Sequence, residues 1–237
     1  MVQGRGLLVI FGLLWAVSAA SPALAQVSGS VTLVSDFRLR GLSLNDGNIA
    51  VAAEVAVDHP TGIYAGASVV AGDTTRFGKE VLNHTAYLGY VTAVDDQATV
   101  DFGLSHTQVY SNVAVPFSGS YTEIYAGVSL RRTSVRVSVT PSFIEPGLRA
   151  AYIDVNRTIP VTQRLRLLAH VGLLIPLGGT DAPILPTSRF DTRVGVARQF
   201  TRGEVQLHWS HTSADAQFLS ERLQQRDAIV ASASWFF

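Results

Sequence analysis

The sequence predicts an all-β protein, a transmembrane antiparallel β-barrel of about 12 strands, and three observations lead to this fold class. Residues 228–237 alternate between apolar and small polar side chains and finish with aromatic ones. Segments with the same alternation, each roughly ten residues long, recur along the chain, and this period is typical of strands. The connections between these segments are alternately short and long, as periplasmic turns and extracellular loops are in outer-membrane barrels.

The beginning of the chain resembles a secretory signal peptide. Arg5 precedes an apolar run from Leu7 to Val17, and Ala23-Leu24-Ala25 has the small-x-small form of a cleavage site. We therefore expect a cleaved signal peptide over residues 1–25 and a barrel over residues 26–237, located in the outer membrane of a Gram-negative bacterium. No later stretch approaches the roughly 18 consecutive apolar residues of a spanning helix, so strands must make any membrane crossing.

Twelve strands are expected from the alternation, with tight turns at 59–62, 95–97, 132–134, 160–163 and 201–203. The long connections fall at 41–48, 72–83, 111–120, 144–150, 175–189 and 213–226. The last strand is expected to pair with the first, and the even number of strands places both termini of the chain in the periplasm. The expected strands are 27–40, 49–58, 63–71, 84–92, 99–110, 121–131, 135–143, 151–158, 165–174, 190–199, 204–212 and 228–237.

The composition excludes several classes of function. Eighteen Lys and Arg residues balance eighteen Asp and Glu residues, so the chain lacks the basic surplus of a nucleic-acid-binding protein. Cysteine is absent, which removes disulfides, thiolate metal sites and cysteine nucleophiles. The histidines lack metal-site spacing and no phosphate-binding loop is present, so we expect no cofactor and no metal.

A soluble β-sandwich also has short alternating strands and is the alternative fold. The second face of the strands favours the barrel. Val135, Val137 and Val139 alternate with charged and hydroxyl side chains, and Val205, Leu207 and Trp209 alternate with Glu204, Gln206 and His208. In a membrane barrel the apolar set faces lipid and the polar set faces the lumen.

This assignment of faces places charges of both signs in the lumen. A mixed interior is typical either of a weakly selective water-filled pore or of ion pairs that brace and narrow a small barrel. The candidate lumen or eyelet residues are Asp36, Arg38, Arg40, Glu54, Arg136, Arg166, Arg193 and Glu204, and the same faces also carry Asp101, Glu123, Asp154 and Asp191.

The densest charge cluster ends the first expected strand. Asp36, Arg38 and Arg40 share one face, and Gly41 would allow the chain to turn sharply into the following loop. One interpretation is a strand end whose charges pair with neighbours across the sheet. The other is an eyelet that sorts ions.

Three stretches carry a resemblance to a known family. They are Ser35-Asp36-Phe37-Arg38-Leu39-Arg40-Gly41-Leu42-Ser43, then Asp46-Gly47-Asn48-Ile49-Ala50, then Gly62-Ile63-Tyr64-Ala65-Gly66. Together they resemble the TorF family of porins (Gcw_chp type), uncharacterised outer-membrane proteins of Gram-negative bacteria. Phe37 stands where the family has tyrosine, and Asn48-Ile49 replaces a segment that usually carries proline. The resemblance implies an outer-membrane barrel with pore activity and no particular substrate.

Two further patterns have structural interpretations. Ile63-Tyr64-Ala65-Gly66 recurs as Ile124-Tyr125-Ala126-Gly127, each after a tight turn, and is expected to place an aromatic residue at the membrane interface and glycine where the wall curves. Trp235 and Phe237 are expected to lie in the aromatic girdle. They also resemble the carboxyl-terminal signal that the outer-membrane assembly machinery recognises.

An enzymatic alternative rests on two H-x-S spacings, because His and Ser on one strand face can act as base and nucleophile. His208 and Ser210 share the inward face, which argues against a lipid substrate. His211 and Ser213 continue the outward face, with Asp215 or Glu221 available to orient the histidine. This pair would make the protein a lipid hydrolase of the lipid A deacylase or phospholipase kind.

The function expected first is a porin-like channel for passive passage of small polar solutes or ions, and not an enzyme. Its partners would be outer-membrane lipids, the outer-membrane assembly machinery and the solutes themselves. Because opposite charges across a narrow lumen can pair, the channel should be narrow and only modestly selective. The loop from Pro176 to Pro186 could fold inward as a constriction or stay outside. A structural or adhesive barrel without transport is the remaining alternative.

Overall fold

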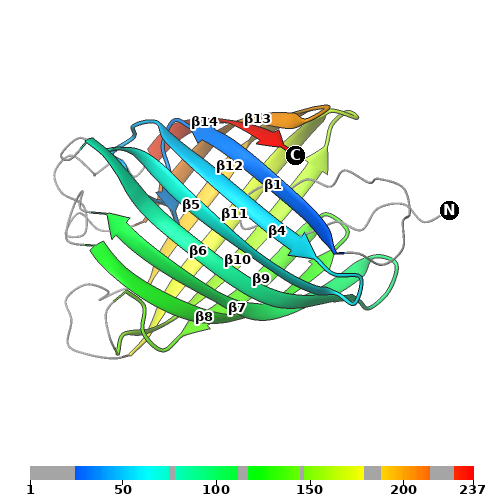
Figure 1. Ribbon diagram of the computed structural model, residues 1–237, viewed down its shortest axis with the longest axis horizontal. Helices are drawn as coiled ribbons and strands as arrows, with labels where there is room; N and C mark the ends of the chain where they lie inside the picture. Colours follow the sequence, from blue (N-terminus) through cyan, green and yellow to red (C-terminus); the bar gives the residue numbers. More distant parts are fainter. Residues whose placement is uncertain (1–24, 75–77, 112–116, 145–146, 179–187, 214–226) are drawn as a thin grey trace.

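The computed structural model describes residues 25–74, 78–111, 117–144, 147–178, 188–213 and 227–237. Twelve strands form one closed antiparallel barrel in which each strand pairs with its neighbours in the chain and the last pairs with the first (Figure 1). No described residue belongs to a helix long and apolar enough to cross a bilayer. The barrel strands are β1 (Gln26–Val34), β4 (Ala50–Asp58), β5 (Ile63–Thr74), β6 (Gly78–Ala93), β7 (Ala98–Ser111), β8 (Phe117–Leu130), β9 (Thr133–Thr140), β10 (Arg149–Pro160), β11 (Leu165–Gly178), β12 (Arg189–Phe200), β13 (Gly203–Thr212) and β14 (Asp227–Phe236).

The predicted barrel and its closing seam are confirmed. β1 pairs with β14 in a register that runs from Ser30 opposite Phe236 to Val34 opposite Ser232. Two backbone hydrogen bonds extend the seam, from the Gly29 amide to the Phe237 carbonyl at 2.9 Å and from the Phe237 amide to the Gly29 carbonyl at 3.0 Å. The carboxyl end of β14 therefore lies at the same end of the barrel as the short turns.

The five tight turns lie where the sequence predicts them, but several strands are longer than expected at the opposite end. The loop predicted over 72–83 is wrong, because β5 and β6 continue their pairing to Thr74 opposite Gly78. Polar side chains such as Asp73 and Lys79 in this extension break the apolar alternation. Backbone pairing does not depend on that alternation, so the strands can extend beyond the apolar band.

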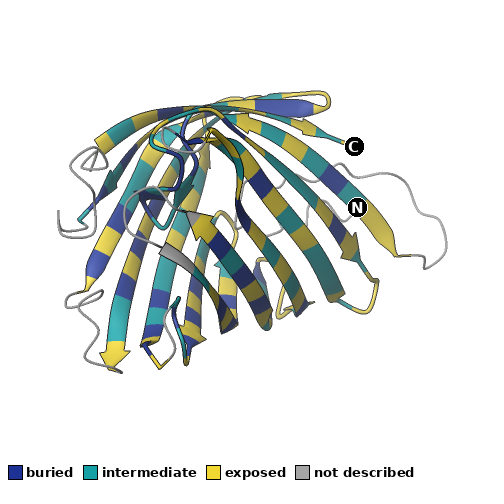
Figure 2. Cartoon of the chain, turned by 60° about the vertical axis from the view of Figure 1, so that its left-hand side comes forward, coloured by how far each residue is buried: buried dark blue, intermediate teal, exposed yellow. Residues whose placement is uncertain are grey.

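The two faces of the wall differ as predicted. Val135, Val137 and Val139 of β9 are each about 40% exposed on the outer surface, whereas Arg136 and Ser138 between them are buried. Figure 2 shows this alternation of exposed and buried residues along most strands. An apolar outer surface with charged residues inside is the reverse of a soluble barrel and is what a bilayer requires.

The first strand departs from its prediction. β1 ends at Val34, not at residue 40, and the following residues turn into the barrel, where they form a short hairpin of β2 (Arg38–Leu39) and β3 (Leu42–Ser43). Arg40 and Gly41 at its tip have φ angles of 49° and 80°, the pair of positive values that a type I′ turn needs. We call residues 35–49 the inner hairpin.

The inner hairpin is held by its own polar contacts and by an apolar cluster inside the barrel. The Phe37 amide donates to the Asn45 side chain at 2.9 Å, and the Leu44 amide donates to the Phe37 carbonyl at 2.8 Å. Phe37 and Leu44 are each 2% exposed, because wall side chains surround them. The wall members of this cluster include Ala50, Val70, Leu82, Val109, Tyr121, Ala150, Tyr152 and Leu174.

Candidate functional site

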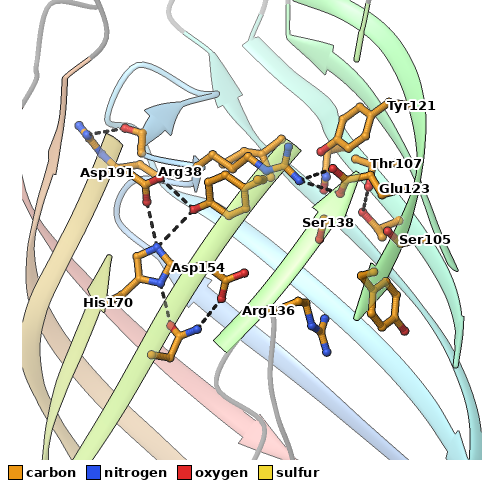
Figure 3. A pocket seen from close by; sticks show the side chains of 18 of the residues that line it. Arg38, Ser105, Thr107, Tyr121, Glu123, Arg136, Ser138, Asp154, His170 and Asp191 are labelled. Carbon is orange, nitrogen blue, oxygen red and sulfur yellow. Dashed lines mark hydrogen bonds and ion pairs between the residues drawn. The ribbon is translucent and has the colours of Figure 1, made fainter. Parts of the chain in front are cut away.

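A polar cavity of about 120 Å³ lies between the inner hairpin and the wall. Residues 38–41 of the hairpin line it together with inward side chains of β5 to β12. Figure 3 shows His170 and Asp191 on one side of this cavity and Tyr121, Thr107 and Glu123 on the other. The hairpin therefore occupies part of the lumen and leaves this small space, lined largely by polar side chains, beside it.

Arg40 fastens the tip of the hairpin to the wall. One of its terminal nitrogens, Nη2, donates to both carboxylate oxygens of Glu123 on β8, at 2.7 and 2.6 Å. The guanidinium carbon also lies 4.3 Å from the ring centre of Tyr152 and between 5 and 6 Å from those of Tyr121 and Phe143. The carboxylate and the aromatic faces offset part of the cost of burying this cation, while its other terminal nitrogen, Nη1, is buried without a hydrogen-bond partner among the described residues.

The other side of the tip touches the opposite wall. A Cβ atom placed on Gly41 would lie 2.6 Å from the Cβ of Asp191 on β12 and 2.9 Å from that of Thr212 on β13. Glycine is needed here both for the positive φ angle and for this close approach. Since Arg40 reaches β8 and Gly41 reaches β12 and β13, the tip spans the lumen.

Asp36 and Arg38 bind each other inside the hairpin instead of facing neighbouring strands. The Asp36 carboxylate accepts from Arg38 Nε at 2.5 Å and from the Ser43 hydroxyl at 2.5 Å. Arg38 Nη1 donates to the Gly41 carbonyl at 3.1 Å. The prediction that Asp36, Arg38 and Arg40 lie on the first barrel strand is therefore wrong, although all three are inside the barrel.

His170 and Asp191 form a second polar group beside the cavity. His170 Nε2 lies 3.0 Å from Asp191 Oδ1, and the Tyr152 hydroxyl donates to Asp191 Oδ2 at 2.9 Å. On its other side, His170 Nδ1 lies 2.7 Å from the side-chain oxygen of Asn156. These bonds join β10, β11 and β12 and fix the orientation of the imidazole ring.

A third group surrounds Asp101 on β7. Arg136 forms an ion pair with the Asp101 carboxylate, the Tyr64 hydroxyl donates to it, and the Tyr64 and Tyr125 hydroxyls are 2.7 Å apart. The guanidinium of Arg136 lies 4.3 Å from the ring centre of Tyr125. The predicted interfacial position of Tyr64 and Tyr125 is therefore wrong, because both hydroxyl groups lie inside the barrel.

The remaining predicted lumen residues are spread over other strands. The Tyr87 hydroxyl donates to Glu54 on β4 at 2.9 Å. Arg166 on β11 forms an ion pair with Glu204 on β13. Arg193 on β12 lines the cavity. The structure thus brings Arg38, Arg40, Arg136 and Arg193 together around one space, while Glu54, Arg166 and Glu204 do not line it.

Sequence reasoning missed the inward tyrosines, which account for much of the interior. Tyr64 lies over Gly89, Tyr87 over Gly66 and Tyr152 over Gly172, where the hydroxyl or ring carbon would be 2.0 to 2.5 Å from an added Cβ. The signal that could have found them is the alternation itself, since each tyrosine occupies the polar face of its strand. Each ring therefore occupies the space that a glycine leaves on a neighbouring strand.

The outward histidine is part of an aromatic group. The His211 ring stacks on Trp209 at 5.7 Å, and its Nδ1 lies 3.0 Å from Asp227 Oδ1. The Ser213 hydroxyl oxygen accepts from the Phe190 amide at 2.8 Å, and the predicted orienting residues Asp215 and Glu221 lie outside the described residues. The carboxylate beside His211 is thus one that sequence reasoning did not select.

Trp235 and Phe237 lie exposed on the outer surface, 56% and 74% respectively. The Phe237 ring covers Gly29 of the first strand, where an added Cβ would lie 2.5 Å from it. The expected signal peptide and most of the loop from Pro176 to Pro186 lie outside the described residues.

A closed antiparallel barrel with an apolar outer surface and a charged interior defines the class as a bilayer-spanning β-barrel. The sequence profile of a family described as bacterial protein of unknown function (Gcw_chp) matches residues 16–237, and the chain belongs to that family. No curated protein matches the chain.

Solved structures share the fold. The NanC porin in a rhombohedral crystal form matches with a TM-score of 0.56 at 11% identity, over 88% of this chain and 98% of that chain. The KdgM porin matches with a TM-score of 0.55 at 8% identity, over 90% of this chain and 98% of that chain. At such identities the likeness concerns the barrel architecture alone.

Proposed function

We propose that this protein is an outer-membrane channel that passes small polar solutes or ions passively and is narrowed by its inner hairpin. The observation that carries the proposal is the hairpin itself, whose tip spans the lumen from Glu123 to Asp191 and leaves a polar cavity of about 120 Å³. Polar groups of both signs along such a constriction suit hydrated or polar solutes and not lipids.

The comparisons support this function without supplying a substrate. Two of the similar barrels are porins, and one KdgM structure contains disordered oligogalacturonate, at a TM-score of 0.52 and 6% identity. The TorF-type resemblance of residues 35–50 and 62–66 points to the same function. It also supports an outer-membrane location in a Gram-negative bacterium, after removal of residues 1–25.

Assembly is proposed to depend on the outer-membrane machinery and on the surrounding lipids. Trp235 and Phe237 are our candidates for the recognised residues, because their rings are exposed on the outer surface beside the seam. Replacing both with serine should lower the amount of folded barrel recovered from outer membranes. Normal recovery of that variant would contradict their role.

The proposed constriction is tested by shortening the inner hairpin. Replacing residues 36–47 with a short Gly-Ser linker removes the tip while leaving the paired residues of β1 and β4 in place. In planar bilayers the wild-type protein should conduct weakly, and the shortened variant should conduct several-fold more. In liposome swelling, the variant should admit larger sugars than the wild type.

The control is a linker of the same composition inserted in the tight turn at Thr201–Arg202, far along the chain from the hairpin. It should leave conductance unchanged. A folded wild-type barrel that conducts as freely as the shortened variant would show that the hairpin does not restrict the path. No conductance in either protein would refute the channel function itself.

A further inference from the structure

We infer that the cavity beside the inner hairpin binds the anionic group of a small solute, a carboxylate or a phosphate. The inference rests on the proposed function and names the substrate class for the same lumen. Four kinds of observation support it: the hydrogen-bonding state of the carboxylates, that of the arginines, the charged and polar groups of the lining, and the size of the space.

The carboxylates that line the cavity are largely used by protein donors. Both oxygens of Glu123 accept from Arg40, and the two oxygens of Asp191 accept from Tyr152 and contact His170. Asp154 accepts from the Asn156 side chain at 2.7 Å through one oxygen. Five of these six oxygens are therefore engaged, which leaves little capacity to bind a cation or a donor-rich solute.

The arginines, in contrast, keep unused donors. Nη1 of Arg40 and Nε of Arg136 are buried and have no hydrogen-bond partner among the described residues. Arg193 has no ion-pair partner within the described part of the chain. Buried donors without acceptors are costly, and a ligand that supplies acceptors removes that cost.

The charged and polar groups of the lining also favour an anion over a cation. Four arginines and three carboxylates line the cavity, and Arg38 and Arg136 are paired with Asp36 and Asp101, which lie outside the lining, so the arginine donors and not a carboxylate surplus face the space. The other polar lining residues include Ser105, Thr107 and Ser138, whose hydroxyls can donate. A cation entering this space would meet repulsion from guanidinium groups and few free oxygens. An anion would meet charge-assisted donors on several sides.

The size of the cavity limits what can be held. A volume of about 120 Å³ is slightly below the roughly 150 Å³ of an engineered cavity that accommodates benzene. The site therefore suits a carboxylate or phosphate group with a few attached atoms. A longer chain could bind only by placing one charged unit there at a time.

Calorimetric titration of the folded barrel in detergent micelles tests the site directly. The probes are malonate, inorganic phosphate and the diamine putrescine. Malonate, phosphate or both should bind, and putrescine should not. Arg193→Gln removes a lining charge and should weaken anion binding roughly tenfold, as the loss of a hydrogen bond to a charged group implies. Binding of malonate but not phosphate assigns carboxylates, and the converse assigns phosphates.

The matched control is Arg198→Gln, on the same strand but on the outer surface, where its guanidinium lies 5.5 Å from the Phe200 ring. It should not change anion binding. If Arg193→Gln does not fold, reversal potentials of the wild type in a potassium chloride gradient provide the second measurement, and chloride should permeate more readily than potassium.

The outcomes separate this inference from the channel function. Conductance without anion binding or anion preference overturns the inference and leaves the channel. Anion binding by a barrel that does not conduct leaves the site and refutes the channel. Putrescine binding in place of the anions, or equal affinities in the wild type and Arg193→Gln, would overturn the site.

Discussion

The outer and inner faces of the barrel wall follow different physical rules. On the outer face, side chains such as Val137 and Leu207 are 40% and 50% exposed and face the lipid, so any apolar residue of suitable size can serve. Inside the barrel, Glu123 and Tyr152 of the wall and Arg40 of the inner hairpin come from three separate parts of the chain, and their contacts depend on mutual geometry. The outer face therefore requires only apolar side chains, whereas the interior requires particular residues that pair with one another.

The largest effect is expected inside the barrel, for Arg40→Ala. The change leaves Glu123 buried without its partner, a loss that typically costs about 3–5 kcal/mol. The hairpin can avoid this cost by leaving the wall, because Glu123 then becomes accessible to water. Single-channel conductance should therefore rise, and residues 35–49 should become accessible to protease.

The control for this variant is Arg157→Ala, which removes an exposed guanidinium bonded to the Thr133 hydroxyl at 3.0 Å. It should change stability by no more than about 0.5 kcal/mol. If Arg40→Ala kept both the wild-type conductance and the protease resistance of the hairpin, Arg40 would not be its anchor.

A charge on the outer face should have the next largest effect. Val137 lies in the middle of β9 with its side chain on the outer surface, so Val137→Arg should reduce the free energy of folding into lipid vesicles by about 2–4 kcal/mol. Urea titration in vesicles measures it. Val137→Leu is the control and should fold normally. Equal stability of the two variants would mean that this face does not contact lipid.

The same contrast explains what could be predicted from the sequence. Strand number, tight turns and the β1–β14 seam follow from local alternation and from the short-long pattern of connections. The inner hairpin could not be found in this way, because Asp36, Phe37 and Arg38 continue the alternation of the strand before them. Here tertiary contacts, the burial of Phe37 against inward apolar residues, outweigh the local pattern.

For the candidate site, the sequence predicted which side chains face the lumen but not which of them pair with one another. Alternation correctly placed Arg136, Glu123 and Asp191 inside, since a side-chain period of two fixes the face once one residue is known. It could not give the partners, because the tilt and stagger of strands decide which inward residues meet across the lumen. Tyr64 illustrates this limit, as its hydroxyl group reaches Asp101 from two strands away.

A smaller effect is expected for Tyr64→Phe, which removes one donor from Asp101 but leaves its ion pair with Arg136. A hydrogen bond to a charged group contributes about 1.5–3 kcal/mol, and unfolding in urea should show a loss in this range. Tyr90→Phe is the matched control on the outer face, where the ring packs 5.5 Å from Phe102. If the two variants lost equal stability, inner-face pairing would not be special.

The smallest effect is expected at the β1–β14 seam, where a hydrogen bond between two hydroxyl groups joins the strands on the lumen side. Thr32 and Ser234 are joined at 2.8 Å across β1 and β14, and Thr85 and Thr107 are joined at 3.0 Å across β6 and β7. Thr32→Val and Thr85→Val should each cost about 0.5–1.5 kcal/mol. The β1–β14 register spans five residue pairs and that of β6–β7 eleven, so only Thr32→Val should also accelerate amide hydrogen exchange along its seam. Equal acceleration in both variants would indicate that closure is no weaker than the rest of the wall.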